Sequence, residues 1–370
     1  MTQHLTTQRL SRLRQRMKET QTDLVALGPS SHMQWLLGLN PHGDERPVMA
    51  IVTADHIAVL MPLLNAESSR AQCDAPFFEW SDDEGPTDAL KRLLKDCAAL
   101  GPNLNIVIDE TMRTDFAFLL LDNLNAPKHR FTEDTIGSLR AEKDEDEYQA
   151  LKASAVLNDR AFEVGFAALR NGVSEFDIRD VIVNYYKENN AQVEFCIVAF
   201  GANSAYPHHH TGGDTLKPNM AVLIDSGCRL NGYPSDMTRC AWYGLPNEEF
   251  LEIGKVVKSA AESATNAAKS GVLCKDVDRA ARQVISDAGY GENFSHRTGH
   301  GLGIDVHEPP YLTATSNTPL AAGNVFSVEP GVYIGGSFGI RLENIIFQRP
   351  DAAEVLSEMP LDVRIIPERA

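Results

Sequence analysis

The chain has 370 residues, of which 43% are hydrophobic and 23% charged, and its formal net charge at pH 7 is −17. This length accommodates two domains with a large buried core. The net charge argues against nucleic acid or an anionic membrane surface as a partner, because both repel an acidic protein. The sequence contains no apolar run of about 18 residues, no signal-peptide pattern and no C-x-x-C pair among its six cysteines. We therefore expect a cytoplasmic globular protein without disulfides or a structural zinc site.

The first part of the chain alternates helix and strand patterns. We predict helices at about 6–19 and 88–100, and strands at 24–27, 49–52, 57–61 and 104–108. Strands separated by helical segments indicate an α/β layer with a partly parallel sheet. No glycine-rich loop follows the first strand, so a dinucleotide site is not expected. We assign residues 1–138 to this N-terminal domain.

A charged stretch, A-E-K-D-E-D-E-Y, opens the second domain, for which we take residues 139–370. A long helix is predicted from this stretch to about Leu169. Further helices are predicted at 174–187, 247–269 and 274–288, and strands at 194–200, 221–227, 236–243, 324–328 and 340–348. The order helix–helix–strand occurs twice, which suits an α+β domain with pseudo-twofold symmetry.

Two aspartates lie in a predicted hairpin of this domain. Asn231-Gly232 is a strong signal for a two-residue turn. Such a turn places Asp225 opposite Thr238, with Asp236 as the diagonal neighbour of Asp225 on the same face. A register slip of one residue would separate the two aspartates, and two solvated side chains are the alternative interpretation. Asp225 follows an apolar run, however, and a buried carboxylate without a partner is costly.

Two glutamates lie in a second predicted hairpin, S-V-E-P-G-V-Y-I-G-G-S-F-G-I-R-L-E-N. A turn in the middle of its glycine-rich connector brings Glu343 to within one residue of the position opposite Glu329. Arg341 shares the face of Glu343, so a plain salt bridge between Arg341 and a glutamate is the alternative interpretation.

Histidines are concentrated in two segments. His296, His300 and His307 lie in S-H-R-T-G-H-G-L-G-I-D-V-H-E-P-P, where glycines beside His300 permit close approach of another backbone. His307-Glu308 does not begin a zincin helix, because Pro309-Pro310 would break it. The run Tyr206-Pro207-His208-His209-His210 lies in a predicted loop, where a histidine run is as often incidental as functional.

Electrostatics favours a metal site if the four carboxylates converge. Each close pair would repel by about 4 kcal/mol at 4 Å and an effective dielectric constant of 20. Two divalent cations would cancel four negative charges. Oxygen-rich ligands with one imidazole suit Mn²⁺ first, with Co²⁺, Fe²⁺ or Zn²⁺ as alternatives. Such a pair of ions is suited to hydrolysis.

The motifs L-I-D-S-G, Y-P-S-D-M-T-R, G-H-G-L-G-I-D-V-H-E, V-E-P-G-V-Y and G-I-R-L-E-N resemble those of the pita-bread metallohydrolases, which include prolidase, aminopeptidase P, methionine aminopeptidase and metal-free creatinase. W-L-L-G-L and E-R-P resemble the creatinase/prolidase N-terminal domain, which methionine aminopeptidase lacks. The resemblance implies an α/β creatinase-like domain followed by an α+β pita-bread catalytic domain with pseudo-twofold symmetry. It also implies a homodimer that hydrolyses the Xaa-Pro bond at the N-terminus of peptides.

By position, the resemblance assigns Asp225 and Asp236 to one metal ion, and His300 and Glu329 to the other, with Asp236 and Glu343 as bridging ligands. All five positions carry residues of ligand type, unlike those of metal-free creatinase.

The resemblance also implies roles around the ions. Glu329 would act as general base on a metal-bridging water. His208 and His307 would contact the substrate and stabilise the tetrahedral intermediate. Arg341 and His296 would order the surrounding ligands and the substrate. His209 and His210 receive no role.

Tyr311 marks a departure from the family pattern. Dipeptide-specific prolidases often carry an arginine near this position, after V-H-E, that holds the free carboxylate of the dipeptide. Tyr311 is therefore expected to contact the substrate, and cleavage of longer Xaa-Pro peptides is favoured over strict dipeptidase activity. Two alternatives are a small-molecule amidohydrolase of the ectoine or creatine type on the same site, and a binding module without catalysis.

Overall fold

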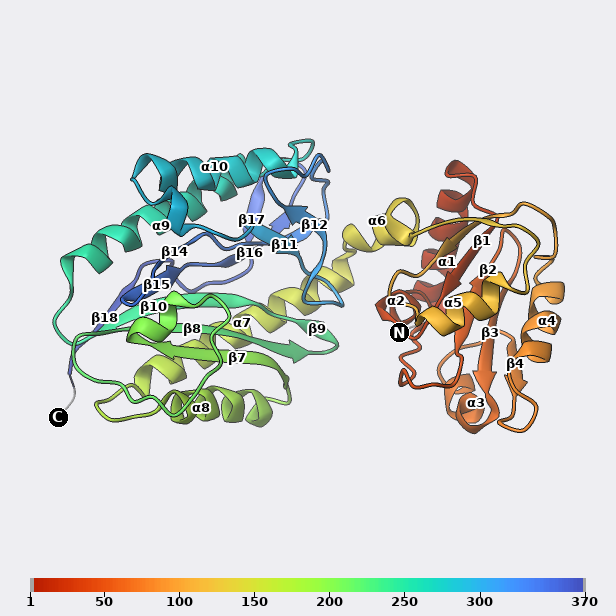
Figure 1. Cartoon of the computed structure of the whole chain (residues 1–370), viewed down its shortest axis with the longest axis horizontal. Helices are drawn as coiled ribbons and strands as arrows, with labels where there is room; N and C mark the ends of the chain where they lie inside the picture. Colours follow the sequence, from red (N-terminus) through yellow and green to blue (C-terminus); the bar gives the residue numbers. More distant parts are fainter. Residues whose placement is uncertain (1–2, 369–370) are drawn as a thin grey trace. The chain divides into compact units, whose positions relative to one another are not determined.

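The structure, a computed structural model, describes residues 3–368 of the chain. It divides into two compact units, one ending at Arg140 and the other beginning at Ala141 (Figure 1). The boundary expected from the sequence, between residues 138 and 139, falls inside helix α6 (Ile136–Ala141). Within residues 3–368, no helix is both long enough and apolar enough to cross a membrane.

The first unit is a six-stranded sheet with helices. Its other elements are α1 (Gln3–Glu19), β1 (Leu24–Leu27), α2 (Ser31–Leu37), β2 (Met49–Val52), β3 (Ile57–Pro62), α3 (Leu63–Arg70), β4 (Phe77–Trp80), α4 (Thr87–Asp96), β5 (Asn105–Ile108), α5 (Thr114–Leu121), β6 (Lys128–Arg130) and the 3-10 turn η1 (Thr132–Asp134). The strand order is β4–β3–β2–β1–β5–β6. Three neighbouring pairs are parallel and two antiparallel. The partly parallel α/β layer expected from the sequence is confirmed.

Short elements of this unit escaped the sequence analysis: α2, α3, α5, β4 and β6. Helix α2 has only seven residues between the capping side chain of Ser30 and Gly38, which ends it with φ 72°. So short a helix presents little periodicity to detect. Helix α4 ends at Asp96 instead of near Leu100, because Ala98 turns the chain with φ 52°.

The second unit contains two helix pairs and their strands. Its elements are α7 (Glu145–Ala167), α8 (Glu175–Glu188), β7 (Gln192–Phe200), η2 (Gly201–Ala205), β8 (Met220–Leu230), β9 (Tyr233–Pro234), β10 (Met237–Tyr243), α9 (Glu248–Ala267), α10 (Cys274–Asp287), η3 (Gly291–Asn293), β11 (Gly299–Gly301), β12 (Glu308–Leu312), β13 (Val325–Val328), β14 (Gly331–Ile334), β15 (Phe338–Arg341), β16 (Asn344–Gln348), β17 (Ala353–Val355) and β18 (Arg364–Ile366). One sheet has the order β18–β10–β8–β7, with β9 paired to β8, and the other the order β12–β11–β13–β16–β17. Strands β14 and β15 form a separate pair.

The strands of the second unit lie between its two helix pairs, with α7 and α8 on one side and α9 and α10 on the other (Figure 1). Alternate residues of β8 serve two cores. Val222 and Ile224 pack in the core that includes residues of α7 and α8, whereas Ala221 and Leu223 pack in the core that includes residues of α9 and α10. Because both faces of β8 are buried, its sequence is a continuous apolar run. Asp225 is the next residue on the face of β8 that carries Ala221 and Leu223.

The strand predicted at 340–348 is wrong in one respect: it is two strands, β15 and β16, interrupted at Leu342 and Glu343. At the interruption the backbone changes partner. The Glu343 N–H donates to the carbonyl oxygen of Thr238 in β10, at 3.2 Å, instead of to the facing strand of its own hairpin. A single-strand pattern could not reveal this exchange, because the new partner lies more than 100 residues away in sequence.

Candidate metal centre

Asp225 and Asp236 come from the hairpin formed by β8, β9 and β10. Asn231 and Gly232 have φ values of 53° and 85°, as a two-residue turn of this type requires. The predicted register is found, with Asp225 opposite Thr238. Asp236 lies in the short gap between β9 and β10, where the ladder is interrupted, and it is buried.

Glu329 and Glu343 come from the second hairpin. The pairs β13–β16 and β14–β15 keep one register on the two sides of a gap, so the two glutamates face each other across it. In the gap, the Glu329 N–H donates to the carbonyl oxygen of Thr298 at 2.8 Å, and the Glu343 N–H to that of Thr238. These bonds join the second hairpin to β10 and to the segment before β11 at the positions of its two carboxylates.

His300 lies in β11 between two glycines. A Cβ atom on Gly299 would come within 1.9 Å of a backbone oxygen of β13, so only glycine fits at that close approach. The His300 Nδ1–H donates to the Gly301 carbonyl oxygen at 3.0 Å. That bond leaves Nε2 directed at Asp236 Oδ2, at 3.5 Å, and at Glu329 Oε1, at 3.4 Å.

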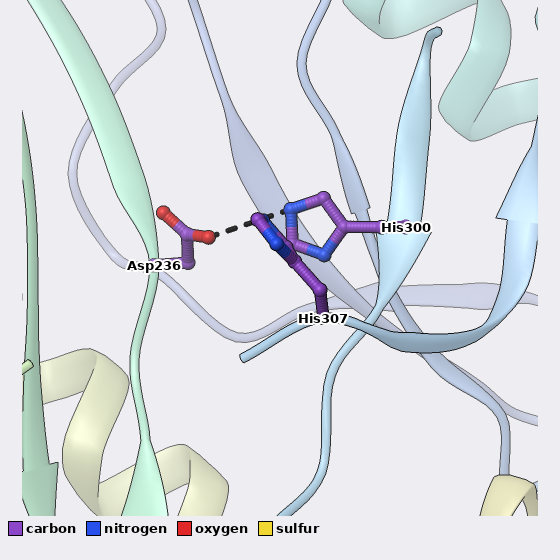
Figure 2. Close-up of side chains that lie close together, drawn as sticks. All are labelled: Asp236, His300 and His307. Atoms are coloured by element: carbon purple, nitrogen blue, oxygen red, sulfur yellow. Dashed lines mark ion pairs between the residues drawn. The ribbon is translucent and has the colours of Figure 1, made fainter. Parts of the chain in front are cut away.

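The five predicted ligands lie together with His307. Their ligand atoms form overlapping groups, in each of which all atoms are within 4.8 Å of one another: Asp225, Asp236 and Glu343; His300, Glu329 and Glu343; Asp236, His300 and His307. Figure 2 shows the last group, in which the rings of His300 and His307 are packed edge to face at a centroid distance of 4.0 Å. The sharing of members makes one continuous cluster.

The charged forms of the carboxylates are disfavoured. Burial, followed by the charges of Glu343, Asp225 and Glu329, raises the pKa of Asp236 well above its ordinary value. Burial and the charges of Glu329 and Asp225 raise the pKa of Glu343 in the same direction. Burial also raises the pKa of Glu329 to about 7. Burial, with the neighbouring His307, lowers the pKa of His300 to about 3, so its Nε2 carries no proton at neutral pH.

The cluster therefore presents lone pairs that a cation could bind. Among the atoms of residues 3–368, the buried oxygens Asp225 Oδ1 and Glu343 Oε1 have no hydrogen-bond partner. The unprotonated Nε2 of His300 also directs its lone pair at carboxylate oxygens. Buried acceptors without donors are rare and costly in proteins. A donor set of carboxylate oxygens and one imidazole nitrogen fits hard or borderline divalent cations.

Arg341 links the cluster to His296. Its guanidinium donates to Asp225 Oδ2 at 2.7 Å, to Thr238 Oγ1 at 2.9 Å and to the Tyr333 hydroxyl at 2.8 Å. The salt bridge with a glutamate, considered above as an alternative, is wrong, because the carboxylate that Arg341 contacts is that of Asp225. The His296 Nδ1–H donates to a backbone carbonyl, so its Nε2 accepts from the Tyr333 hydroxyl at 2.8 Å. Burial, with the charge of Arg341, lowers the pKa of His296 to about 4 and keeps this ring neutral.

His208 lies on an exposed loop that follows η2. The carbonyl oxygen of the preceding Pro207 accepts a hydrogen bond of 3.4 Å from Arg341, which ties the loop to the cluster. The charge of His208 contributes to the lowered pKa of His296 and His307, after larger contributions from burial and nearby arginines. His208 thus lies near both rings, with its side chain open to solvent.

Tyr311 is 37% exposed and lies in β12. It does not stand alone: the Arg297 guanidinium is stacked over its ring, with the guanidinium carbon 4.8 Å from the ring centroid. Arg297 was not singled out from the sequence, since the two residues are separated by a turn and their contact depends on the pairing of β11 with β12.

His209, to which the resemblance assigned no role, contacts a buried carboxylate. His209 Nε2 lies 2.8 Å from Glu175 Oε2. The buried Glu175 carboxylate also accepts from the Phe200 and Gly212 N–H groups and from the Asn203 side chain. Glu175 therefore holds both ends of the loop that carries His208. Glu175 is the first residue of α8, and its local sequence gives no sign of this role. The role arises from contacts with residues that lie 25 to 37 positions later in the sequence.

Lys143, in the charged stretch that opens the second domain, is a second supporting residue that was not singled out from the sequence. Its ammonium group is fully buried and lies 2.6 Å from Glu308 Oε1. Glu308 follows His307 directly, so this ion pair fixes the segment that presents His307. A buried charge requires such a partner.

Models of two protein families match the chain. The family described as "Metallopeptidase family M24" matches residues 149–349, and "Creatinase/Prolidase N-terminal domain" matches residues 9–127. The first match contains all five residues of the predicted ligand set and the second falls within the first structural unit.

Individual proteins resemble the chain over almost its whole length. An Xaa-Pro dipeptidase of Lactobacillus helveticus is 30% identical over 365 residues, which cover 97% of this chain and 99% of the relative. The solved structure of a prolidase from Thermococcus sibiricus is 31% identical, with a TM-score of 0.90 over 97% of this chain and 99% of that chain. A dipeptidase from Mycobacterium ulcerans is 27% identical, with a TM-score of 0.93 over 99% of both chains.

Proposed function

The chain belongs to metallopeptidase family M24, and on this premise we propose that it hydrolyses the Xaa-Pro bond at the N-terminus of short peptides. The proposed cofactor is a pair of divalent cations held by Asp225, Asp236, His300, Glu329 and Glu343. The observation that carries the proposal is the convergence of these five side chains. Two of their buried oxygens and the imidazole nitrogen of His300 receive no hydrogen bond from a donor.

Specificity for proline is supported by the relatives. Proteins named Xaa-Pro dipeptidase or prolidase align with 97% of the chain. They do not favour the small-molecule amidohydrolase of the ectoine or creatine type. The binding-module alternative is also disfavoured, because a cluster of buried carboxylates without a bound ion would be costly to hold folded.

Cations bound in this cluster would polarise the scissile carbonyl and lower the pKa of a water molecule. We propose Mn²⁺ first, with Co²⁺, Fe²⁺ or Zn²⁺ as alternatives, since carboxylate oxygens predominate over nitrogen. Glu329 Oε1 is the proposed proton acceptor. A carboxylate oxygen at this position could take a proton from the attacking water and pass it to the leaving nitrogen.

The residues around the cluster have distinct proposed roles. Arg341 holds Asp225 Oδ2 in place, so that only Oδ1 of that carboxylate is open to a cation. His296 is fixed as a neutral ring by Tyr333 and the following carbonyl. His307 and His208 lie at the exposed side, where N–H donors can stabilise negative charge that develops on the scissile carbonyl oxygen.

The decisive experiment compares metal-stripped protein with protein reloaded with Mn²⁺, using Ala-Pro and Ala-Pro-Ala as substrates and Ala-Ala as the control for proline specificity. We expect hydrolysis of at least one proline substrate only after reloading, and little cleavage of Ala-Ala. Activity that survives thorough metal removal would refute the metal-dependent mechanism. Loaded protein that cleaves neither proline peptide would refute the substrate assignment.

A homodimer is the proposed assembly, supported by the resemblance of the N-terminal domain to that of creatinase and prolidase. Static light scattering tests it, and an active monomer would contradict it.

A further inference from the structure

The segment that carries His296, residues 294–298, lies between η3 and β11 and belongs to no helix or strand. Phe294 and Thr298, at the two ends of this segment, are buried. Buried backbone groups need hydrogen-bond partners, and an irregular segment has no ladder to supply them. The side chains that do supply them therefore determine where the segment lies, and with it His296.

Arg282 of α10 supplies donors to this segment. Its guanidinium donates to the Phe294 carbonyl oxygen at 3.0 Å and to the His296 carbonyl oxygen at 2.9 Å. The guanidinium carbon also lies 4.2 Å from the centroid of the Phe294 ring. That ring packs edge to face against the His296 ring, with the two centroids 5.1 Å apart. One side chain thus holds the main chain at His296 and the aromatic ring that packs against it.

Asp278 lies one turn earlier on α10 and orients this guanidinium. Its buried carboxylate accepts from the guanidinium at both oxygens, each at 3.0 Å. Asp278 Oδ1 also accepts from the Thr298 hydroxyl at 2.8 Å and from the Thr298 N–H at 3.2 Å, an N–H that Leu312 shares. The Thr298 carbonyl oxygen in turn accepts from the Glu329 N–H at 2.8 Å. The pair on α10 therefore reaches the main chain of a proposed metal ligand as well as that of His296.

The His296 ring has its other contact toward the cluster. Its Nε2 accepts from the Tyr333 hydroxyl, whose oxygen accepts from Arg341, the residue that holds Asp225. The charges agree with these contacts: after burial and the charge of Arg341, the charge of Arg282 also lowers the pKa of His296. A chain of contacts therefore runs from α10 through His296 to a proposed metal ligand.

We infer that Arg282, oriented by Asp278, is a positioning residue of the active site that acts through His296. The inference rests on the proposed function and adds to it a residue that lies outside the metal cluster. The role requires a planar guanidinium, because the group serves two carbonyl oxygens and two carboxylate oxygens at once. A lysine could keep the ion pair with Asp278 but not the other contacts. The competing interpretation is that the pair only stabilises α10, as charge pairs four residues apart do.

The test is a double-mutant cycle of Arg282→Lys and His296→Ala in Mn²⁺-loaded protein. It measures kcat and KM with whichever of Ala-Pro and Ala-Pro-Ala the wild type cleaves. The control Arg279→Lys makes the same change at an exposed arginine of α10 that pairs with Asp276. Metal content, melting temperature and hydrogen–deuterium exchange of the peptide that spans residues 294–300 are measured for every variant.

We expect Arg282→Lys to lower kcat/KM by about 10- to 100-fold, because a displacement of about 1 Å in an active site has effects of this size. The loss should divide between kcat and KM as it does in His296→Ala. In the His296→Ala background the same change should lower kcat/KM by less than about threefold, since residues that act through one contact are not additive. Exchange in residues 294–300 should be faster in Arg282→Lys with metal content unchanged, and Arg279→Lys should match wild type throughout.

Wild-type activity in Arg282→Lys, or an equal loss in the presence and absence of His296, would overturn the role of Arg282 and leave the proposed function standing. A loss of activity that follows a loss of bound metal would do the same, because it would show damage to the cluster instead of displacement of His296. If loaded wild type cleaves neither Ala-Pro nor Ala-Pro-Ala, both the proposed function and this inference fall.

Discussion

Among residues 3–368, two clusters have the spacing of metal ligands, and they differ in what their oxygens contact. In the first unit, His32, Asp109 and Glu110 offer ligand atoms within 4.8 Å of one another, as the cluster of the second unit does. Both Asp109 oxygens, however, accept hydrogen bonds from neighbouring N–H and hydroxyl groups. Glu110 accepts from Thr132 at 2.6 Å, and His32 contacts Arg140 through Nδ1.

The pKa values show the same difference. Burial acts to raise the pKa of Glu110, but hydrogen bonds from His32 and Thr132 outweigh it and lower the pKa to about 2. Burial and like charges instead raise the pKa of Asp236, Glu329 and Glu343. Spacing alone therefore does not identify a metal centre. The distinguishing feature is a set of buried acceptors for which the protein provides no donor.

The largest expected effect is that of Asp236→Asn, which removes a charge from the centre of the cluster in the second unit. We expect loss of bound metal and a fall in kcat of about a thousandfold or more, since cations stabilise developing charge by several kcal/mol. Metal content by elemental analysis, together with Ala-Pro hydrolysis, measures both. Glu110→Gln is the matched control and should keep its metal and activity. Equal metal loss in the two variants would erase the distinction between the clusters.

Glu175→Gln tests a carboxylate that, like that of Glu110, has its donors. An amide group in its place would direct N–H at one of the donors, and a buried donor left without an acceptor costs about 1–3 kcal/mol. We expect a lower melting temperature and about tenfold lower activity through the loop of His208, with metal content unchanged. Loss of metal together with activity would show that Glu175 acts on the cluster itself.

Glu329→Gln should stabilise the metal-free protein at pH 8. The folded-state pKa of Glu329, about 7, lies above the ordinary value of 4.5, so the charged form costs stability. This cost is fully present above pH 7, shrinks between pH 7 and 4.5, and is absent below. The expected gain in melting temperature, about 2–4 °C per kcal/mol for a unit of this size, should follow the same course. Chelator-treated samples scanned at pH 5 to 8 measure it, and a variant less stable than wild type at pH 8 would contradict the raised pKa.

Glu110→Gln should lower the stability of the protein at pH 7, the opposite of the effect of Glu329→Gln, and its effect should be the smallest of the four. The folded-state pKa of Glu110 is lowered to about 2, so its charged form contributes stability above pH 4.5 that is lost as pH falls toward 2. The side chain is 43% exposed, so solvent screening limits the effect to about 1 kcal/mol or less. Thermal unfolding should show a melting temperature below that of wild type at pH 7, and a smaller difference at pH 3.5. A stabilised variant at pH 7 would count against the comparison.

Local sequence signals were sufficient for both hairpins of the second unit. Asn231-Gly232 determines a two-residue turn, and strand alternation then carries its register to Asp225. The confirmed α/β layer likewise follows from alternating apolar segments and helical periodicity. The short helix α2 and the interruption at Glu343 of the strand predicted at 340–348 were missed, since neither leaves a periodic pattern.

The sequence by itself determined which residues of ligand type exist, their order and the hairpins that present them, because turns and strand alternation act over a few residues. Only the tertiary structure decided which buried oxygens have donors, that Arg341 holds Asp225 rather than a glutamate, and that Arg297 lies over Tyr311. These facts depend on strands and loops that meet from distant parts of the chain. Hydrogen bonding and burial are properties of that meeting, and no local pattern encodes them.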